Sequence, residues 1–359
     1  MKTKIGICLT FILAAAFVIS PGKGFTQSTV QGKDFIPKVE KIINKAVEQE
    51  LFSGVVLIAK EGKVLFSKAY GEANRDRHIK NTLNTKFDIC SIGKIFTSTS
   101  IMLLAQKGLL KISDPVIKYL PDFPFGNKIT IHHLLTHTAG FGNFFSIPEY
   151  WQSIDKMRSV NAVLPLIYKQ KLEFETPGEK WQYSNSGIVV LGAVIEKVSG
   201  IAYNEFIQKN IFGPLKMKES GLIYPEDKVE NRSIGYIKNN DGSFKNNIGV
   251  IPPASPAGGL LTTANDLLIF DQALYSNSLL NQEYKKIMFT PLLNNYACCW
   301  MVENKYNNNT VGHSGGAPGA NSMFRRYLND KYTIIILSNY DRGTQSVFAP
   351  VEAAVLGKE

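Results

Sequence analysis

The spacing of apolar residues changes along the chain, and it predicts strand-rich ends around a helical middle. Residues 34–51 carry apolar side chains at every third or fourth position, which is typical of an amphipathic helix. Two β-rich runs follow at 54–60 and 63–71, and the pair Glu61-Gly62 between them predicts a β-hairpin.

From Ser91 onward the spacing becomes helical, and it stays so to about residue 287 with proline and glycine loops between the helices. β-rich runs then return, and a last helix is expected over 344–356. The expected helices of the middle are 92–110, 131–135, 186–199, 202–211 and 264–274, and the expected late strands are 297–302, 310–313, 321–328 and 332–337.

This pattern predicts an α+β fold. The simplest arrangement joins the N-terminal hairpin to the C-terminal strands in one antiparallel sheet flanked by the two terminal helices, with a mainly helical lobe inserted between them. Residues 28–90 and 297–359 would form the α/β sheet domain, and residues 91–296 the mainly helical domain. A functional site is expected between sheet and lobe, where pockets commonly form.

Residues 1–27 have the layout of a secretory signal peptide. Lys2 and Lys4 precede an apolar run, residues 5–19, that is too short to span a bilayer comfortably, and a polar segment follows. We therefore expect a periplasmic or secreted protein, cleaved between about Gly22 and Ser28. No later apolar run is long enough to cross a membrane, so no transmembrane segment is expected after the signal peptide.

The charge of the chain argues against a nucleic-acid partner. Its net charge of +10 falls to +7 (10 − 3) when Lys2, Lys4 and Lys23 leave with the signal peptide. Acidic residues lie among the remaining lysines, so an ordinary solvated surface is expected. Three cysteines remain after cleavage, too few for a disulfide framework.

Ser91 and Lys94 are the first candidates for chemistry. A lysine three residues after a serine lies beside it on a helical turn, where it can help to remove the hydroxyl proton. The same spacing occurs at 20–23 and 153–156, and a serine that caps a helix is the plain alternative. Cys90 is a rival nucleophile, but its place at the end of an apolar run favours packing.

Two other patterns fail on their own requirements. His133 and His137 lie one helical turn apart, but a zinc protease motif needs a glutamate directly after the first histidine, where Leu134 stands, so structural histidines are expected. Residues 312–316 match the Gly-x-Ser-x-Gly nucleophile elbow, yet no histidine follows Ser314 in the chain to complete that site.

Three short segments in chain order carry a stronger signal. Residues 91–94, 183–185 and 313–315 match Ser-x-x-Lys, Tyr-x-Asn and His-x-Gly. In this order and setting they resemble the serine β-lactamase and penicillin-binding-protein superfamily, specifically its branch of class C β-lactamases, D-peptidases and esterases. Residues 134–141 and 255–263 look like further stretches of the same family, so the resemblance covers nearly all of the chain after the signal peptide.

The resemblance implies roles for single residues. Ser91 would be the acylated nucleophile, Lys94 the neighbour that helps to remove its proton, and Tyr183 the companion acid/base. The backbone N–H groups of Ser91 and Gly316 would stabilise the oxyanion. Neither a metal nor an organic cofactor is required. The implied substrate-binding residues are Asn185, His313, Ser314, Gly315 and Gly316.

The third segment departs from class C β-lactamases, which carry Lys-Thr-Gly where this chain has His313. A histidine is mostly neutral at about pH 7, so strong anchoring of a β-lactam carboxylate is not expected. Arg325 and Arg326 are either a replacement anchor or surface charges.

The sequence therefore predicts an exported serine hydrolase of the carboxypeptidase or esterase type. It would cleave an ester or amide bond in a small ester or D-peptide, with cell-wall fragments among the candidate substrates. The alternatives are a class C-like β-lactamase and a slowly deacylating penicillin-binding protein.

Overall fold

The computed structural model describes residues 34–222, 224 and 227–358. The predicted signal peptide, residues 1–27, lies outside the described residues. From Asp34 onward the chain forms one compact unit.

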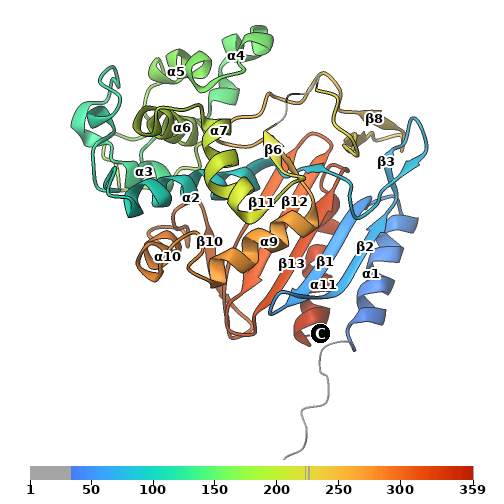
Figure 1. Cartoon of the computed structure of the whole chain (residues 1–359). Helices are drawn as coiled ribbons and strands as arrows, with labels where there is room; N and C mark the ends of the chain where they lie inside the picture. The colour runs from blue at the N-terminus through green and yellow to red at the C-terminus, as the bar shows by residue number, and fades with distance from the viewer. Residues whose placement is uncertain (1–33, 223, 225–226, 359) are drawn as a thin grey trace, which may run out of the picture. The chain divides into compact units, whose positions relative to one another are not determined.

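A six-stranded sheet brings the two ends of this unit together, as predicted (Figure 1). All neighbouring strands are antiparallel, and the N-terminal hairpin joins the C-terminal strands in a register that places Ile58 opposite Ile334. In spatial order the strands are β10 (Met301–Lys305), β11 (Asn308–Ala317), β12 (Ala320–Tyr327), β13 (Tyr332–Ser338), β1 (Gly54–Lys60) and β2 (Lys63–Tyr70).

Helices cover both faces of the sheet, which explains why β1 and β13 are apolar on both sides. The terminal helices α1 (Ile36–Glu48) and α11 (Phe348–Leu356) pack with Val56 and Ile336 in one hydrophobic cluster. On the other face, Leu57 belongs to a larger cluster with α2 (Gly93–Gln106) and α9 (Ala264–Tyr275). The predicted α+β architecture is confirmed.

The chain between β2 and β10 is mainly helical, as predicted. Three expected helices are present with ends that differ by no more than one residue: α3 (Ile131–Leu135), α6 (Asn185–Ser199) and α9. The boundaries that we assigned to the two domains stay a prediction. The remaining helices are α4 (Pro148–Gln152), α5 (Val160–Tyr168), α7 (Tyr203–Ile207), α8 (Gly213–Leu215) and α10 (Gln282–Phe289).

Short strands also occur in this middle segment, and the sequence did not predict them. They have two or three residues each, which is too short for a period of two to become visible. They are β3 (Glu72–Asn74), β4 (Ile79–Lys80), β5 (Phe87–Asp88), β6 (Gly221–Leu222), β7 (Tyr236–Lys238), β8 (Phe244–Asn246) and β9 (Leu260–Thr262).

Several predicted elements have different bounds in the structure. The helix predicted over 92–110 ends at Gln106, the strand predicted over 310–313 is longer, Asn308–Ala317, and the helix predicted over 344–356 begins at Phe348. The strand predicted over 297–302 begins only at Met301, because Cys299 adopts a left-handed conformation, φ 60°, in a buried turn before it. The helix predicted over 202–211 is α7 followed by a π-helical stretch, Gln208–Phe212.

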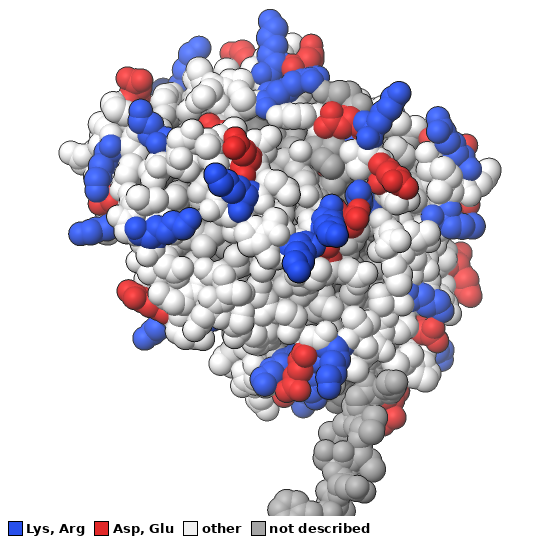
Figure 2. All heavy atoms as spheres, viewed as in Figure 1, with Lys and Arg blue, Asp and Glu red and all other residues white. Residues whose placement is uncertain are grey.

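Among the described helices, none is long and apolar enough on its own to cross a bilayer. The segments Asn185–Ser199 and Tyr203–Leu215 reach that length and composition only as a pair, with a bend of 74° between them. On the face shown in Figure 2, lysine and arginine side chains lie among aspartates and glutamates.

Candidate active site

Ser91 lies in a 3₁₀ turn, Cys90–Ile92, directly before α2, and Lys94 lies in the first turn of that helix. The Lys94 Nζ donates hydrogen bonds to the Ser91 Oγ at 3.0 Å and to the Ala257 carbonyl oxygen at 2.5 Å. Lys94 is fully buried, whereas Ser91 is partly exposed. The structure therefore combines a reachable hydroxyl with a buried amine that contacts it, as an activated serine requires.

Two alternatives for this turn do not agree with the structure. No side chain caps α2, and Lys94 binds the Ser91 hydroxyl, so the capping interpretation is wrong. The neighbouring Cys90 is buried, and burial raises the pKa of its thiol well above the ordinary value, with Asp88 adding to the rise. A reactive thiolate is therefore disfavoured at Cys90, which agrees with the predicted packing role of this side chain.

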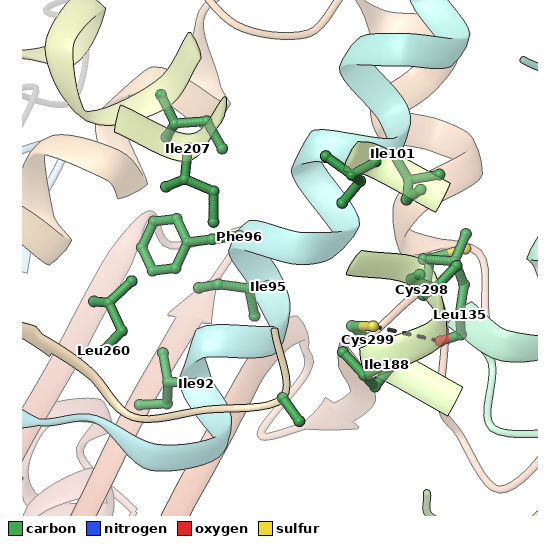
Figure 3. Close-up of a cluster of buried hydrophobic side chains, with 14 of the residues drawn as sticks. Ile92, Ile95, Phe96, Ile101, Leu135, Ile188, Ile207, Leu260, Cys298 and Cys299 are labelled. Carbon is green, nitrogen blue, oxygen red and sulfur yellow. Dashed lines mark hydrogen bonds between the residues drawn. The ribbon is translucent and has the colours of Figure 1, made fainter. Parts of the chain in front are cut away.

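The surrounding core fixes the position of Lys94. Figure 3 shows Ile92, Ile95 and Phe96 pointing into a cluster of buried apolar side chains. The polar residues of α2 have partners as well, since the Ser98 hydroxyl donates to the Cys298 carbonyl oxygen at 2.6 Å. A helix packed on all sides holds the lysine in a fixed position relative to Ser91.

The Tyr-x-Asn segment lies at the start of α6, where the Ser184 side chain caps the helix. The Lys94 Nζ lies 5.0 Å from the centroid of the Tyr183 ring, so the structure brings these two predicted residues together. Asn185 is the first residue of α6 and its side-chain amide donates to the Asn143 Oδ1 at 3.2 Å.

The third segment belongs to β11, which contacts the turn that carries Ser91. A Cβ atom on Gly315 would lie only 2.2 Å from the Ile89 carbonyl oxygen, so this position has room for glycine alone. Ser322 on β12 donates to the same oxygen at 2.8 Å. Because Ser314 lies in a strand, the nucleophile-elbow interpretation stays rejected.

A cavity of about 460 Å³ opens between these segments. Three predicted site residues, Lys94, Asn185 and Gly315, lie beside the described lining of the cavity and not in it. Lys94 contacts Ser91 from below, the Asn185 amide donates to Asn143, and Gly315 packs on Ile89. The residues that line the cavity are Ser91, Trp181, Tyr183, Asn294, Asn295, Tyr296, Met301, Glu303, His313, Ser314 and Gly316.

The cavity offers no free cation among its described lining residues, and Glu303 is the one charged side chain there. Arg325 is buried and donates to Glu303 at 2.6 Å, while Arg326 is buried and pairs with Asp271 at 2.5 Å. Both arginines are therefore structural, and neither the replacement anchor nor the surface charge that we expected is correct. Burial, and then the charge of Lys94, lowers the pKa of His313 to about 3.

The sequence assigned no role in this site to three residues that the structure places there. His137 was predicted to be structural, and its ring lies 4.5 Å from that of Tyr183 and 4.8 Å from that of Tyr296, within the site. His137 and Ala257 lie in the stretches that resembled the family, which was the available signal. Tyr296 comes from an Asn-rich loop before β10, and no pattern marked it.

His133, the other candidate metal ligand, has a structural role. Its side chain and that of Thr130 form a capping box at the start of α3. Among the described residues, no group of three or more His, Cys, Asp or Glu side chains is arranged to hold a metal ion.

Comparisons with known proteins agree with this geometry. The family model described as Beta-lactamase matches residues 39–356. Penicillin-binding protein 4* of Bacillus subtilis (strain 168) is 32% identical over 335 residues, which cover 86% of this chain and 72% of that protein. The chain spans only 59% and 62% of the length of two further curated relatives that it matches.

Solved structures share the fold. A penicillin binding protein from Bacillus halodurans superposes with a TM-score of 0.80 at 30% identity, over 86% of this chain and 98% of that one. A D-amino acid amidase from Ochrobactrum anthropi SV3 gives a TM-score of 0.79 at 20% identity, over 91% and 100%, which shows likeness of fold alone. The chain therefore belongs to the β-lactamase family, and it is a serine hydrolase of the β-lactamase and penicillin-binding-protein type.

Proposed function

We propose that this chain is an exported serine hydrolase that cleaves an ester or amide bond of a small ester or D-peptide through an acyl-Ser91 intermediate. The observation that carries the proposal is the contact of the buried Lys94 Nζ, at 3.0 Å, with the Oγ of Ser91, which lines a cavity. The N-terminal pattern of residues 1–27 supports export.

The residues around Ser91 supply each step. Lys94 in its uncharged form, with Tyr183 beside it, takes the hydroxyl proton on its amine lone pair while the Ser91 Oγ forms a bond to the substrate carbonyl carbon. The backbone N–H groups of Ser91 and Gly316 stabilise the resulting oxyanion, an effect worth on the order of 3 kcal/mol per donor in other acyl-transfer enzymes. The leaving alcohol or amine takes the proton, and water then hydrolyses the acyl ester.

The charge of the cavity supports a substrate without a carboxylate close to the scissile bond. A β-lactam or a C-terminal peptide carboxylate needs a cation, but Arg325 and Arg326 are both paired with acids. His313 is neutral near pH 7, and Glu303, the one charged side chain among the described lining residues, is paired with Arg325. These features support an uncharged ester or amide over a β-lactam, and so a small-ester or D-peptide hydrolase over a class C-like β-lactamase.

A slowly deacylating penicillin-binding protein is the second candidate. The identity of 32% with penicillin-binding protein 4* and of 30% with the Bacillus halodurans structure supports this candidate. It shares the acyl-Ser91 intermediate with the first proposal and differs in how fast water releases it.

Substrate panels separate the candidates. The purified chain would be offered a short-chain nitrophenyl ester, D-alanyl peptides, a chromogenic cephalosporin and a fluorescent penicillin. Ser91→Ala should abolish turnover, whereas the matched control Ser153→Ala, which removes the serine of the Ser-x-x-Lys sequence at 153–156, should not. Turnover of the ester or peptide supports the hydrolase, and a stable penicillin adduct without turnover supports the binding protein. Equal turnover by Ser91→Ala would refute both.

A further inference from the structure

A chain of hydrogen bonds crosses the site from the start of α6 to β11. The Ser184 backbone N–H donates to the His137 Nδ1 at 3.3 Å, and the His137 Nε2 lies 3.2 Å from the Tyr296 hydroxyl. That hydroxyl lies 2.9 Å from the His313 Nε2, and the His313 Nδ1 lies 2.5 Å from the Ser314 carbonyl oxygen. All three side chains are buried, so bulk water does not compete for these bonds.

The two backbone groups at its ends determine the direction of every bond in this chain. A backbone N–H only donates, so the His137 Nδ1 must accept and the neutral ring carries its proton on Nε2. A carbonyl oxygen only accepts, so the His313 ring carries its proton on Nδ1 and its Nε2 must accept. The Tyr296 hydroxyl therefore accepts from His137 and donates to His313. The reverse direction would place two hydrogens in one end contact and two lone pairs in the other.

Neutral rings agree with the surroundings of both histidines. Burial, followed by the nearby charge of Lys94, lowers the pKa of His313 to about 3. The same two causes in the same order, with His313 as a third, lower the pKa of His137 well below its ordinary value. A proton added to either ring would disrupt one of the four bonds.

We infer that Tyr296 is a positioning residue, which holds His313 as the neutral Nδ1–H tautomer and ties β11 to the start of α6 across the cavity. The effect of Tyr296 on the reaction rate rests on the proposed function. The tautomer of His313 does not rest on it, because the hydrogen bonds alone determine the tautomer. One end of the chain is the residue after Tyr183, and the other is the Ser314 carbonyl, two residues before the proposed oxyanion donor Gly316. The bond chain thus fixes the two sides of the site relative to one another.

This arrangement limits what His313 does. Both of its ring nitrogens are engaged, so it neither takes the Ser91 proton nor presents a positive charge to a substrate. Proton transfer is left to Lys94 and Tyr183. His313 contributes to substrate binding through its shape and through the strand that it orients.

Tyr296→Phe removes one hydroxyl and keeps the ring. The matched control is Tyr327→Phe, since Tyr327 is also buried and its hydroxyl donates to the Glu352 Oε1 at 2.5 Å, away from the cavity. We expect Tyr296→Phe to lower kcat/KM for a nitrophenyl ester on the order of 10- to 100-fold, as loss of an orienting partner does elsewhere. The control should keep the activity of the unmodified chain.

Nitrogen-15 spectra of the histidine rings in the full chain give the readout that a merely structural role would not change. At pH 7, His313 should show the Nδ1–H tautomer and His137 the Nε2–H tautomer, with signals assigned from His137→Gln and His313→Gln. In Tyr296→Phe the His313 Nε2 signal should shift toward that of a nitrogen without a donor, and in Tyr327→Phe it should not.

Three results would overturn the inference: an Nε2–H or doubly protonated His313 in the unmodified chain, unchanged His313 signals in Tyr296→Phe, or equal activity of the two tyrosine variants. The tautomer of His313 is measured in the unmodified chain, so that result does not depend on a variant that folds. Ser91→Ala distinguishes failure of the proposed function from failure of this inference. Full activity of Ser91→Ala would refute the proposed function, and the tautomers would still decide whether the inference about Tyr296 is correct.

Discussion

A methyl group on Gly315 should separate the nucleophile from the strand beside it. Its Cβ would lie 2.2 Å from the Ile89 carbonyl oxygen and 2.3 Å from the Ser322 Oγ. Carbon and oxygen approach closely only to about 3.3 Å, so β11 and the turn must move apart by about 1 Å (3.3 − 2.2). Ser91 follows two residues after Ile89, so the movement is passed to the nucleophile.

The magnitudes follow from this displacement. A misplacement of about 1 Å costs on the order of 100-fold in rate, and overpacking a core contact costs about 1 to 3 kcal/mol of stability. Gly315→Ala should therefore lower kcat/KM about 100-fold for a nitrophenyl ester, and urea unfolding should show the loss of stability.

The neighbouring glycine provides a matched control for stability. A Cβ on Gly316 would meet only the Asn321 Nδ2, at an ordinary distance of 3.6 Å. Gly316→Ala should therefore unfold at the same urea concentration as the unmodified chain. If Gly315→Ala were as stable as Gly316→Ala and as active as the unmodified chain, the close contact between strand and nucleophile would be refuted.

Three further changes test separate features. Lys94→Met keeps the buried volume but removes the amine. It should lower kcat/KM on the order of 10²- to 10⁴-fold, while circular dichroism shows that the chain stays folded. A loss below tenfold would show that Lys94 has only a structural role. Arg326→Met leaves the Asp271 carboxylate buried without its ion pair, so urea unfolding should show a loss of about 3 to 5 kcal/mol, and unchanged stability would contradict a buried ion pair. The folded-state pKa values of His137 and His313 lie below their unfolded values, so the unfolded chain takes up protons first as the pH falls and stability decreases. Between pH 7.5 and 5.5 the loss should be about 1.4 kcal/mol for each ring, and constant stability across this range would show that the two rings are not buried in the neutral form.

The sequence predicted the elements whose apolar residues follow the spacing of a strand or a helix. The strands around Ile58 and Ile334 and the helix 131–135 each carry a regular apolar pattern, and the structure confirms them. The buried turn at Cys299 was predicted as a strand, because a compact apolar run looks the same whether it is extended or folded back.

The candidate site was predictable only in part. Ser91 and Lys94 are three residues apart, so local spacing was enough to pair them. Tyr296 reaches His137 and His313 from a loop without any pattern, and only the tertiary fold brings these three residues together. The ion pairs of Arg325 and Arg326 depend in the same way on distant partners, which is why both residues were misassigned.

The acyl-enzyme itself tests the central proposal most directly. The chain would be mixed with excess nitrophenyl ester, quenched in acid within the first turnovers, digested and analysed by mass spectrometry. The proposal predicts one acyl group on the peptide that contains Ser91, and none in Ser91→Ala. An acyl group on another residue, or full turnover with no covalent adduct, would contradict it.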